Sequence, residues 1–583
     1  MEVFLSKSAI TKLWTAVIAV ILIVAIAGAS LYAYYALTPP GTERPPISNP
    51  DTLTVAVSKM ISNFDPGTHS GKQHWDVLRN IYENLIEIDP QNPNNLIPQL
   101  ITEVPTVENG LISADHKTFT FHIRQGVKFH NGAELDAYDV AYTIQRICVL
   151  QLSYSAMITN CLTTKNVSSA VINNMVTVND KYTVTFRTLA PDSTFIPKLT
   201  VSTCLIVNKD YVIEHGGWNP ETANNTEWIG KLDAWMTTNT MGTGPFKLSR
   251  YDAEDKVILE RFEDYRKGPA TLRQVVMVKI SDGSTRLSML EKGDADIVEI
   301  NPKYMSQAQT LKNVNVSTNL VAQYNIVIFS HNIDTSNPFP GSTATSDFYD
   351  DIDLRKGIAY AYDYDKYVQV GLGGYGVRLN SFIVPGTEGY DPDIPLYPHD
   401  TGKAIEHFKK ARNGTVWANG FTIYMISWEG WEEGIVGGEV FKDSIEAINP
   451  KFRVNHITLP WPTGVARMAK DQMESWAGIW MPRYWSGYDY AENVMYSTGN
   501  YGAFSNYYNP NVDQLINQLK SEFNATRRTE ILHRLQWIFY EDCVGILQGQ
   551  FPVFGAQRTW VQGRIHDPLT RYQHTYYTIS KAY

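Results

Sequence analysis

Residues 113–140 read SADHKTFTFHIRQGVKFHNGAELDAYDV, and this stretch says more about the fold than any other part of the chain. The alternating apolar and polar residues of TFTFHI predict a strand. The tripeptide HNG, which begins at His130, supplies the glycine that a tight turn needs. Asp136 or Asp139 can cap a helix over residues 137–150, whose apolar spacing is helical. We interpret the stretch as a strand, a turn and a capped helix that determine a scaffold and do not contact a ligand.

Strand and helix patterns alternate along the chain after residue 50, without an internal repeat. Residues 53–57 are typical of a strand, and residues 75–88 (WDVLRNIYENLIEI) have the i, i+3, i+4 apolar spacing of a helix. Residues 512–523 and 527–540 predict two successive helices. Mixed strands and helices in this order favour an α/β architecture with interrupted domains.

Composition and motifs exclude several classes of protein. The net charge of −10 argues against a nucleic-acid-binding protein, because such a protein needs a basic surface. There is no HExxH, GxSxG or Walker motif, and GLGGYG at 371–376 lacks the strand before it and the helix after it that dinucleotide binding requires. A hydrolase would need two carboxylates facing each other across a cleft, and Asp350-Asp351 and Glu432-Glu433 are the acidic pairs available. We expect neither an enzyme nor a cofactor.

Four segments, in a fixed order, resemble the solute-binding proteins of dipeptide and oligopeptide ABC transporters (family five). They are YENL and PQL at 82–85 and 98–100, the stretch at 113–140, GTGPFK at 242–247 with 259–262 and 293–297, and DLRKGIAYAYD at 353–363. The resemblance implies an α/β, two-lobed fold like that of the periplasmic binding proteins, of the large type with an extra inserted subdomain. It also implies that the protein captures a solute between two hinged lobes and delivers it to the permease subunits of an ABC importer.

The resemblance further implies the limits of the domains. These are a discontinuous lobe I at 51–88, 201–322 and 545–583, an inserted subdomain at 89–200, and lobe II at 323–544. The chain would cross between the lobes near residues 322 and 544, which would form the hinge. A ligand that contacts both lobes only in the closed form shifts the population towards that form.

The N-terminal residues form a separate unit in the sequence. Residues 13–37 carry no charge, and this run exceeds the roughly 20 residues that cross a bilayer. Lys7 and Lys12 precede it, so the positive-inside rule places the N-terminus in the cytoplasm. We expect residues 1–37 to be a cytoplasmic stub and a transmembrane anchor, or a long signal, followed by a Pro-rich spacer at 38–50. The body would then lie on the extracellular side of the cell membrane, an arrangement that resembles that of archaeal surface binding proteins.

Tryptophans gather in one part of the chain, since seven of the fourteen lie between Trp417 and Trp485. The last of them belong to the segment WMPRYWSGYDYAEN at 480–493, which is too polar to be buried throughout. We take this region as the ligand surface, and we expect Trp480→Ala and Trp485→Ala to weaken binding with little loss of stability. The candidate ligand-binding residues are Trp428, Trp431, Trp461, Trp480, Arg483, Tyr484, Trp485, Tyr488, Asp489 and Asn493.

The same segment departs from the family at one position. In peptide-binding members an aspartate of the corresponding segment pairs with the α-ammonium of the ligand, because a buried cation needs a carboxylate partner. Here that position is occupied by Arg483 or Gly487, depending on the alignment. Aromatic faces with neutral polar groups suit an oligosaccharide, so the expected ligand is an oligomeric solute with a preference for an oligosaccharide over an oligopeptide. The alternatives are a peptide-specific binding protein that uses Arg483 or Asp489, and a non-transport cell-surface structural protein that reuses the fold.

Cysteines and glycosylation sequons complete the candidate sites. Cys148 and Cys161 are close enough in sequence to form a disulfide in an oxidising exterior, which would leave Cys204 and Cys543 as a second pair. Four cysteines allow three connectivities, and free buried thiols are the alternative. Sequons that permit glycosylation occur at Asn166, Asn224, Asn315, Asn413 and Asn524.

Overall fold

The computed structural model describes residues 47, 49–68, 72–164, 166–566, 569 and 575–582. The chain divides into two compact units, Met1–Ser48 and Asn49–Tyr583, and the second contains every element described below. The predicted anchor at 13–37 and nearly all of the spacer lie outside the described residues, so both stay predictions. Within the described part of the chain, no helix is long and apolar enough to cross a membrane.

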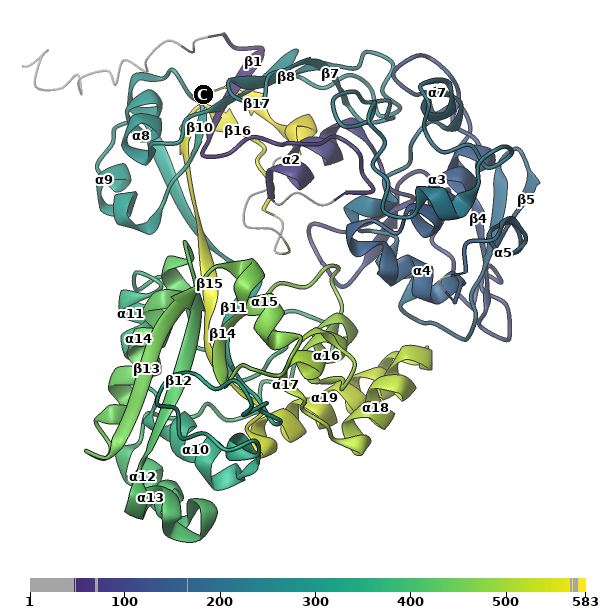
Figure 1. The fold of residues 1–583 in the computed structure, drawn as a ribbon. Helices are drawn as coiled ribbons and strands as arrows, with labels where there is room; N and C mark the ends of the chain where they lie inside the picture. Colours follow the sequence, from purple (N-terminus) through teal and green to yellow (C-terminus); the bar gives the residue numbers. More distant parts are fainter. Residues whose placement is uncertain are drawn as a thin grey trace, which may run out of the picture. The chain divides into compact units, whose positions relative to one another are not determined.

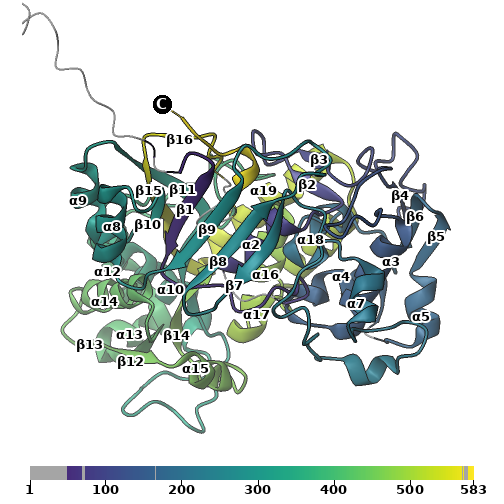
Figure 2. The same ribbon diagram turned by 90° about the horizontal axis from the view of Figure 1, so that it is seen from above.

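One ten-stranded mixed sheet runs through the second unit (Figure 2). Its strands β1, β9 and β10 pair in parallel, as do β12, β13 and β14, whereas β11 and β15 pair antiparallel with their neighbours. In order across the sheet the strands are β13 (Phe452–Leu459), β12 (Phe421–Trp428), β14 (Ser475–Trp480), β11 (Val314–Phe329), β15 (Gly545–Arg558), β10 (Ile297–Glu299), β1 (Thr52–Val57), β9 (Gln274–Lys279), β8 (Lys256–Arg261) and β7 (Phe246–Tyr251).

Strands β11 and β15 join the two halves of this sheet (Figure 1). Residues 314–320 of β11 pair with 552–558 of β15 beside β10, and residues 324–328 pair with 545–550 beside β14. The register shifts between Leu320 and Tyr324 and again between Asn325 and Ile326, so the pairing of the two strands is irregular over residues 320–326. Two neighbouring strands therefore connect the halves, with an irregularity between them.

The half of the sheet around β12 has helices on both faces, as an α/β architecture requires. Successive residues of a strand point to opposite faces. Ile423 and Met425 accordingly belong to one core, with helices α10 (Ile352–Ala361) and α14 (Glu432–Glu446). Tyr424 and Ile426 belong to another core, with the helices that follow β14. Those helices are α16 (Gly487–Met495), α17 (Asn500–Ser505), α18 (Pro510–Ser521) and α19 (Ala525–Asp542).

The stretch that opened the sequence analysis folds as predicted. Strand β4 (Thr118–His122) forms a three-stranded sheet with β6 (Thr183–Arg187) and β5 (Val176–Asp180). Gly132 has a φ of 88°, which confirms the turn. Helix α3 (Ala137–Leu150) begins at Asp136, whose side chain and that of Asp139 form a capping box.

The helix predicted over residues 75–88 is shorter than expected. Helix α2 (Lys72–Ile81) ends before Tyr82, and residues Ile86–Ile88 form strand β2. Ile86 and Ile88 are two residues apart, which fits the period of a strand. Ile86 also follows Tyr82 by four residues and Ile88 follows Ile81 by seven, which fits the period of the preceding helix. A short apolar run cannot distinguish the two.

Candidate ligand-binding site

Two adjoining cavities open on the helices that follow β14. We call the first the charged cavity: it has a volume of about 640 Å³, and Lys198, Arg483, Glu492 and Lys520 are its charged lining residues. We call the second the tryptophan cavity: it has a volume of about 410 Å³ and is lined by Trp428, Trp431, Trp461 and Trp476. Asn500 and Phe504 line both, so the two cavities are neighbours.

The charged cavity depends on the loop between β14 and α16. Strand β14 ends at Trp480, and Ser486 begins α16 by accepting a hydrogen bond from the backbone N–H of Tyr488. The residues between them form a short loop that carries Arg483, while Glu492 and Asn493 lie on α16. One short segment thus supplies an arginine, a carboxylate and an amide to the same cavity.

Arg483 is held by two carboxylates of α16. Its Nε and Nη2 donate to Oδ1 of Asp489 at 2.8 and 2.6 Å, and its backbone N–H donates to Oδ2 of the same residue at 2.9 Å. Nη2 also donates to Glu492 Oε2 at 3.0 Å. Burial disfavours the charged form of Arg483, but the carboxylates of Asp489 and Glu492 outweigh burial and raise its pKa. Asp489 is therefore committed to Arg483 and has no exposed surface.

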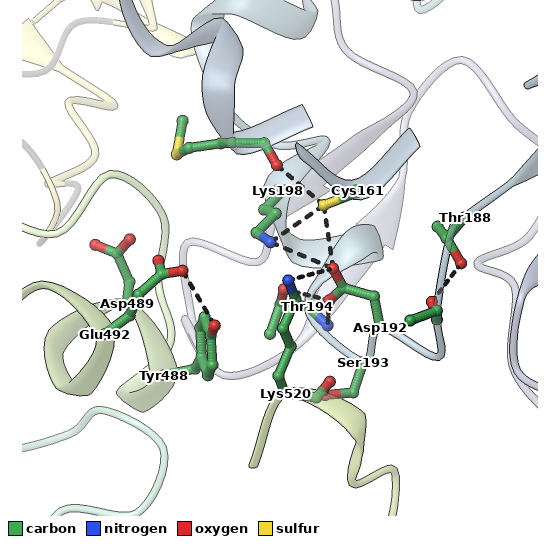
Figure 3. A network of polar contacts seen from close by, with 12 residues as sticks. Cys161, Thr188, Asp192, Ser193, Thr194, Lys198, Tyr488, Asp489, Glu492 and Lys520 are labelled. Carbon is green, nitrogen blue, oxygen red and sulfur yellow. Dashed lines mark hydrogen bonds and ion pairs between the residues drawn. The ribbon is translucent and has the colours of Figure 1, made fainter. Parts of the chain in front are cut away.

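A second buried ion pair, between Lys198 and Asp192, lies beside α16 (Figure 3). Lys198 lies 3.5 Å from Asp192 Oδ2 and donates to the thiol of Cys161 at 3.3 Å. Its ammonium also lies 5.8 Å from the ring centroid of Tyr488 on α16. Burial disfavours the charge on Lys198, yet the neighbouring Cys161, Asp192 and Glu492 raise its pKa, so the side chain is cationic. Lys520 of α18 approaches the same Asp192 at 3.9 Å.

In the tryptophan cavity, the end of β12 packs closely against the helix that begins at Trp461. Trp428 ends β12, and its indole N–H donates to the Ala477 carbonyl of β14 at 2.8 Å. Trp461 packs edge-on against it, with ring centroids 4.9 Å apart, and is 60% exposed. At Gly464, which lies on α15 (Trp461–Met468), a Cβ atom would be 2.0 Å from the Trp428 ring, so no side chain fits there. The ring of Trp461 therefore offers aromatic surface to a ligand, whereas Trp428 and Trp476 are 6% and 1% exposed.

Two indole donors in these cavities are buried and have no hydrogen-bond partner in the described residues. One is Nε1 of Trp431 in the tryptophan cavity, and the other is Nε1 of Trp480 in the charged cavity. A buried donor without a partner costs about 1–3 kcal/mol, and native proteins contain few of them. Both donors therefore belong to tryptophans that line the two cavities and are not used by the described part of the protein.

The structure brings six of the ten predicted residues to the cavities. Trp428, Trp431 and Trp461 line the tryptophan cavity, and Trp480, Arg483 and Asn493 line the charged cavity. Tyr484, Trp485, Tyr488 and Asp489 line neither.

The burial of Trp480 and Trp485 argues against the expectation that their alanine variants lose little stability. Trp480 and Trp485 are 6% and 8% exposed and belong to the core beside β14. The indole N–H of Trp485 donates to Asn94 Oδ1 at 2.8 Å. Truncating either side chain to alanine leaves a cavity in a packed core, and such changes cost about 3–5 kcal/mol.

Among the charged and tryptophan residues that line the cavities, sequence reasoning missed four: Lys198, Trp476, Glu492 and Lys520. Glu492 and Trp476 could have been found, because they fall inside or beside the predicted segment. No local pattern marks Lys198 or Lys520, since each is a single basic residue distant in sequence from residues 480–493.

The four cysteines are buried free thiols in the structure, so the predicted disulfides are not formed. Cys204 is close enough to interact electrostatically with Cys148 and Cys161, whereas Cys543 neighbours Tyr397 and Arg355 instead. A pair of Cys204 with Cys543 does not fit this arrangement. Burial raises the pKa of the Cys148 and Cys161 thiols to about 12, so both stay protonated and unreactive.

Two further expectations concern surface and metal chemistry. All five sequon asparagines are exposed, and glycosylation stays a prediction. Across the described ranges, no group of three or more His, Cys, Asp or Glu side chains is placed to hold a metal ion.

Comparison with known proteins identifies the family. The profile described as "Bacterial extracellular solute-binding proteins, family 5 Middle" matches residues 95–502. The dipeptide-binding protein of Escherichia coli K12 is 24% identical over 545 residues, which cover 89% of this chain and 93% of that protein.

Two solved structures have a similar fold. HbpA2 from Haemophilus parasuis has a TM-score of 0.74 at 17% identity, covering 91% of this chain and all of that one. The binding protein DppA from Helicobacter pylori, solved with the peptide STSA, has a TM-score of 0.69 at 20% identity and covers 91% of this chain and 98% of its own. The fold is thus the two-lobed α/β fold of periplasmic binding proteins. Because the family profile covers well over half of the sequence, the chain belongs to the bacterial extracellular solute-binding proteins of family 5, which are binding proteins and not enzymes.

Proposed function

We propose that this protein captures a peptide in the two adjoining cavities and delivers it to its permease. The observation that carries the proposal is the difference in chemistry between the cavities. One presents charged groups and the other presents tryptophan rings, and they meet at Asn500 and Phe504. A peptide has charged termini and apolar side chains on one backbone, so it can use both cavities at once.

The preference for an oligosaccharide is not supported by the comparisons. That preference was based on the absence of an aspartate at the position that Arg483 or Gly487 occupies. In the structure, Arg483 lies in this loop and pairs with the carboxylate of Asp489. The charged cavity is still lined by Lys198, Glu492 and Lys520, and a neutral sugar makes no ion pair with any of them. The relatives named above bind a dipeptide and the peptide STSA, which also favours a peptide.

The domain limits given by the resemblance belong to the same proposal. The shift in register between Leu320 and Tyr324 lies close to residue 322, and the β15 residues at this level are Gln550 and Pro552. Gly545, where β15 begins, pairs with Ile328 further along, so the second crossing lies near residue 551 and not at 544. Because the ladder is interrupted there, β11 and β15 can bend at this level with little loss of hydrogen bonding. We assign the hinge to this part of the two strands.

A thermal-shift screen tests the proposed function. Di- to pentapeptides and neutral oligosaccharides are compared at equal concentration on the purified chain. A ligand at a hundredfold excess over its Kd stabilises the folded state by about 2.7 kcal/mol. We expect peptides to raise the melting temperature and neutral oligosaccharides to leave it unchanged. Stabilisation by oligosaccharides alone would show the proposal to be wrong.

A further inference from the structure

The charges around the charged cavity are arranged unevenly. Three of the charged side chains that line it are cations: Lys198, Arg483 and Lys520. The anions that pair with them, Asp192 and Asp489, are 2% and 0% exposed and do not line the cavity. Glu492 is the single acidic lining residue. A ligand in the cavity therefore meets the cations first and their counter-ions at a greater distance.

Several donors in the cavity are not used by the protein. Nη1 of Arg483 donates no hydrogen bond to a described residue, although Nε and Nη2 are both engaged. Lys520 is 34% exposed, and its contact with Asp192 is an ion pair at 3.9 Å, too long for a hydrogen bond. Trp480 lines the same cavity, and its buried Nε1 has no partner among the described residues. These groups are all donors, so they suit an acceptor with several oxygen atoms.

The acidic group is a poor partner for a ligand cation. Glu492 Oε2 accepts from Arg483 at 3.0 Å, and Oε1 accepts from the Tyr488 hydroxyl at 3.1 Å. Each carboxylate oxygen is thus already engaged, and an adjacent guanidinium repels an incoming ammonium. The one carboxylate that lines the cavity is thus already engaged, whereas cationic donors remain available.

We infer that the charged cavity binds a carboxylate of the ligand, with Arg483 and Lys520 as its donors, and that Lys520 is a residue that determines specificity. This inference rests on the proposed function, which makes the ligand a peptide. A peptide offers a carboxylate at its C-terminus or on an acidic side chain. The planar carboxylate fits the free edge of a guanidinium, and a mobile ammonium can complete the contact. The α-ammonium of the ligand is then bound elsewhere or left in solvent.

The first experiment compares modified forms of each peptide that the screen identifies, by titration calorimetry. The free peptide, its C-terminal amide and its N-acetyl derivative are measured, each with and without an Asp or Glu side chain. We expect binding to weaken at least tenfold when a peptide has lost every carboxylate, both the C-terminal one and any on a side chain. N-acetylation should weaken binding less than threefold. If the amide loses affinity only in peptides without an acidic residue, either source of carboxylate serves. If every amide loses affinity, the C-terminus is the source.

The second experiment changes the protein. Lys520→Met should reduce the tenfold preference for the free acid over the amide to threefold or less, and Lys520→Arg should retain it. Lys366→Met is the matched control, because Lys366 is 44% exposed and pairs with Asp443 away from both cavities. It should leave the preference unchanged. A preference that is the same in the wild type and Lys520→Met would overturn the role of Lys520.

The outcomes separate this inference from the proposed function. Sugar acids and neutral oligosaccharides are included in the same titrations. If sugar acids bind and no peptide binds, the peptide proposal is rejected and the carboxylate site is supported. Peptides that bind equally well as acid and amide, but not after N-acetylation, would support the peptide proposal and overturn the carboxylate site. Failure of every carboxylate-bearing compound to bind would overturn both.

Discussion

The charged cavity and the tryptophan cavity are neighbours, but they are held together in different ways. The charged cavity combines Lys198 with Arg483, Glu492 and Lys520, which lie far from it in the sequence. Buried counter-ions fix these side chains in place. The tryptophan cavity is lined only by residues between Gln323 and Phe504, and ring packing and close glycines shape it.

The difference indicates how each cavity should respond to mutation. Removing one partner of a buried ion pair leaves an uncompensated charge and destabilises the fold. Removing an exposed ring from a packed surface takes away contact area and leaves no buried charge. Breaking the buried ion pairs of the charged cavity should therefore appear mainly in stability, and loss of the exposed ring of Trp461 mainly in ligand affinity.

The largest effect is expected from Asp489→Ala. This change leaves the buried guanidinium of Arg483 with Glu492 alone, and breaking such a pair costs about 3–5 kcal/mol of unfolding free energy. Urea unfolding measures it. Asp443→Ala is the control, because its ion pair with Lys366 is exposed and worth about 0–1 kcal/mol. Equal losses in the two variants would contradict the buried role of Asp489.

Asp192→Asn should have the next largest effect, and it should depend on pH. Burial disfavours the charged form of Asp192, but Lys198 and Lys520 outweigh it and lower the pKa below the ordinary 3.8. A lowered pKa in the folded state gives stability that is fully present above the unfolded value and is lost as the pH falls through the folded one. We expect the variant to lose about 3 kcal/mol at neutral pH, because Lys198 is left without its carboxylate.

The loss from Asp192→Asn should narrow as the pH falls below 3.8, where the wild-type carboxylate also becomes neutral. Unfolding in urea across this range provides the measurement. Asp255→Asn, at an exposed ion pair with Lys256, is the control. A difference between wild type and Asp192→Asn that does not change with pH would show that hydrogen bonding, and not charge, explains the loss.

Trp461→Ala tests the tryptophan cavity with a smaller effect. Because Trp461 is 60% exposed, we expect little change in stability but about tenfold weaker binding of the peptides found in the screen, equivalent to about 1.4 kcal/mol. Calorimetry and thermal unfolding measure the two quantities. Trp485→Ala, at a tryptophan that is 8% exposed, should reverse the pattern by losing about 3–5 kcal/mol of stability. Unchanged affinity in Trp461→Ala would remove this cavity from the proposed site.

The smallest effect is expected from Trp431→Phe. The indole N–H of Trp431 has no partner in the described structure, so its removal should leave stability unchanged. If a ligand accepts from this donor, binding should weaken by about 0.5–1.5 kcal/mol. Trp428→Phe is the matched control, since its N–H donates to the Ala477 carbonyl and its loss should lower stability. A ligand that binds Trp431→Phe as well as wild type does not use this donor.

Much of the scaffold could be predicted from local patterns. The strand, turn and capped helix between residues 118 and 150 formed as expected, because alternation, a left-handed glycine and an N-cap are properties of adjacent residues. The end of α2 was missed because Ile86 and Ile88 satisfy two periods at once. The predicted disulfides do not form, because spacing in sequence says nothing about burial or the distance between thiols.

The sequence by itself determined the α/β class and the concentration of tryptophans near the site. It also showed that Arg483 or Gly487 stands where peptide-binding members have an aspartate. Only the tertiary structure decided which side chains of residues 480–493 face a cavity. Arg483 lines the charged cavity, while Trp485 enters the core and Asp489 is buried as a counter-ion. Only the structure placed Lys198 opposite α16. The reason is physical: periodicity is a local property of a chain, whereas burial and charge pairing depend on which distant segment packs against it.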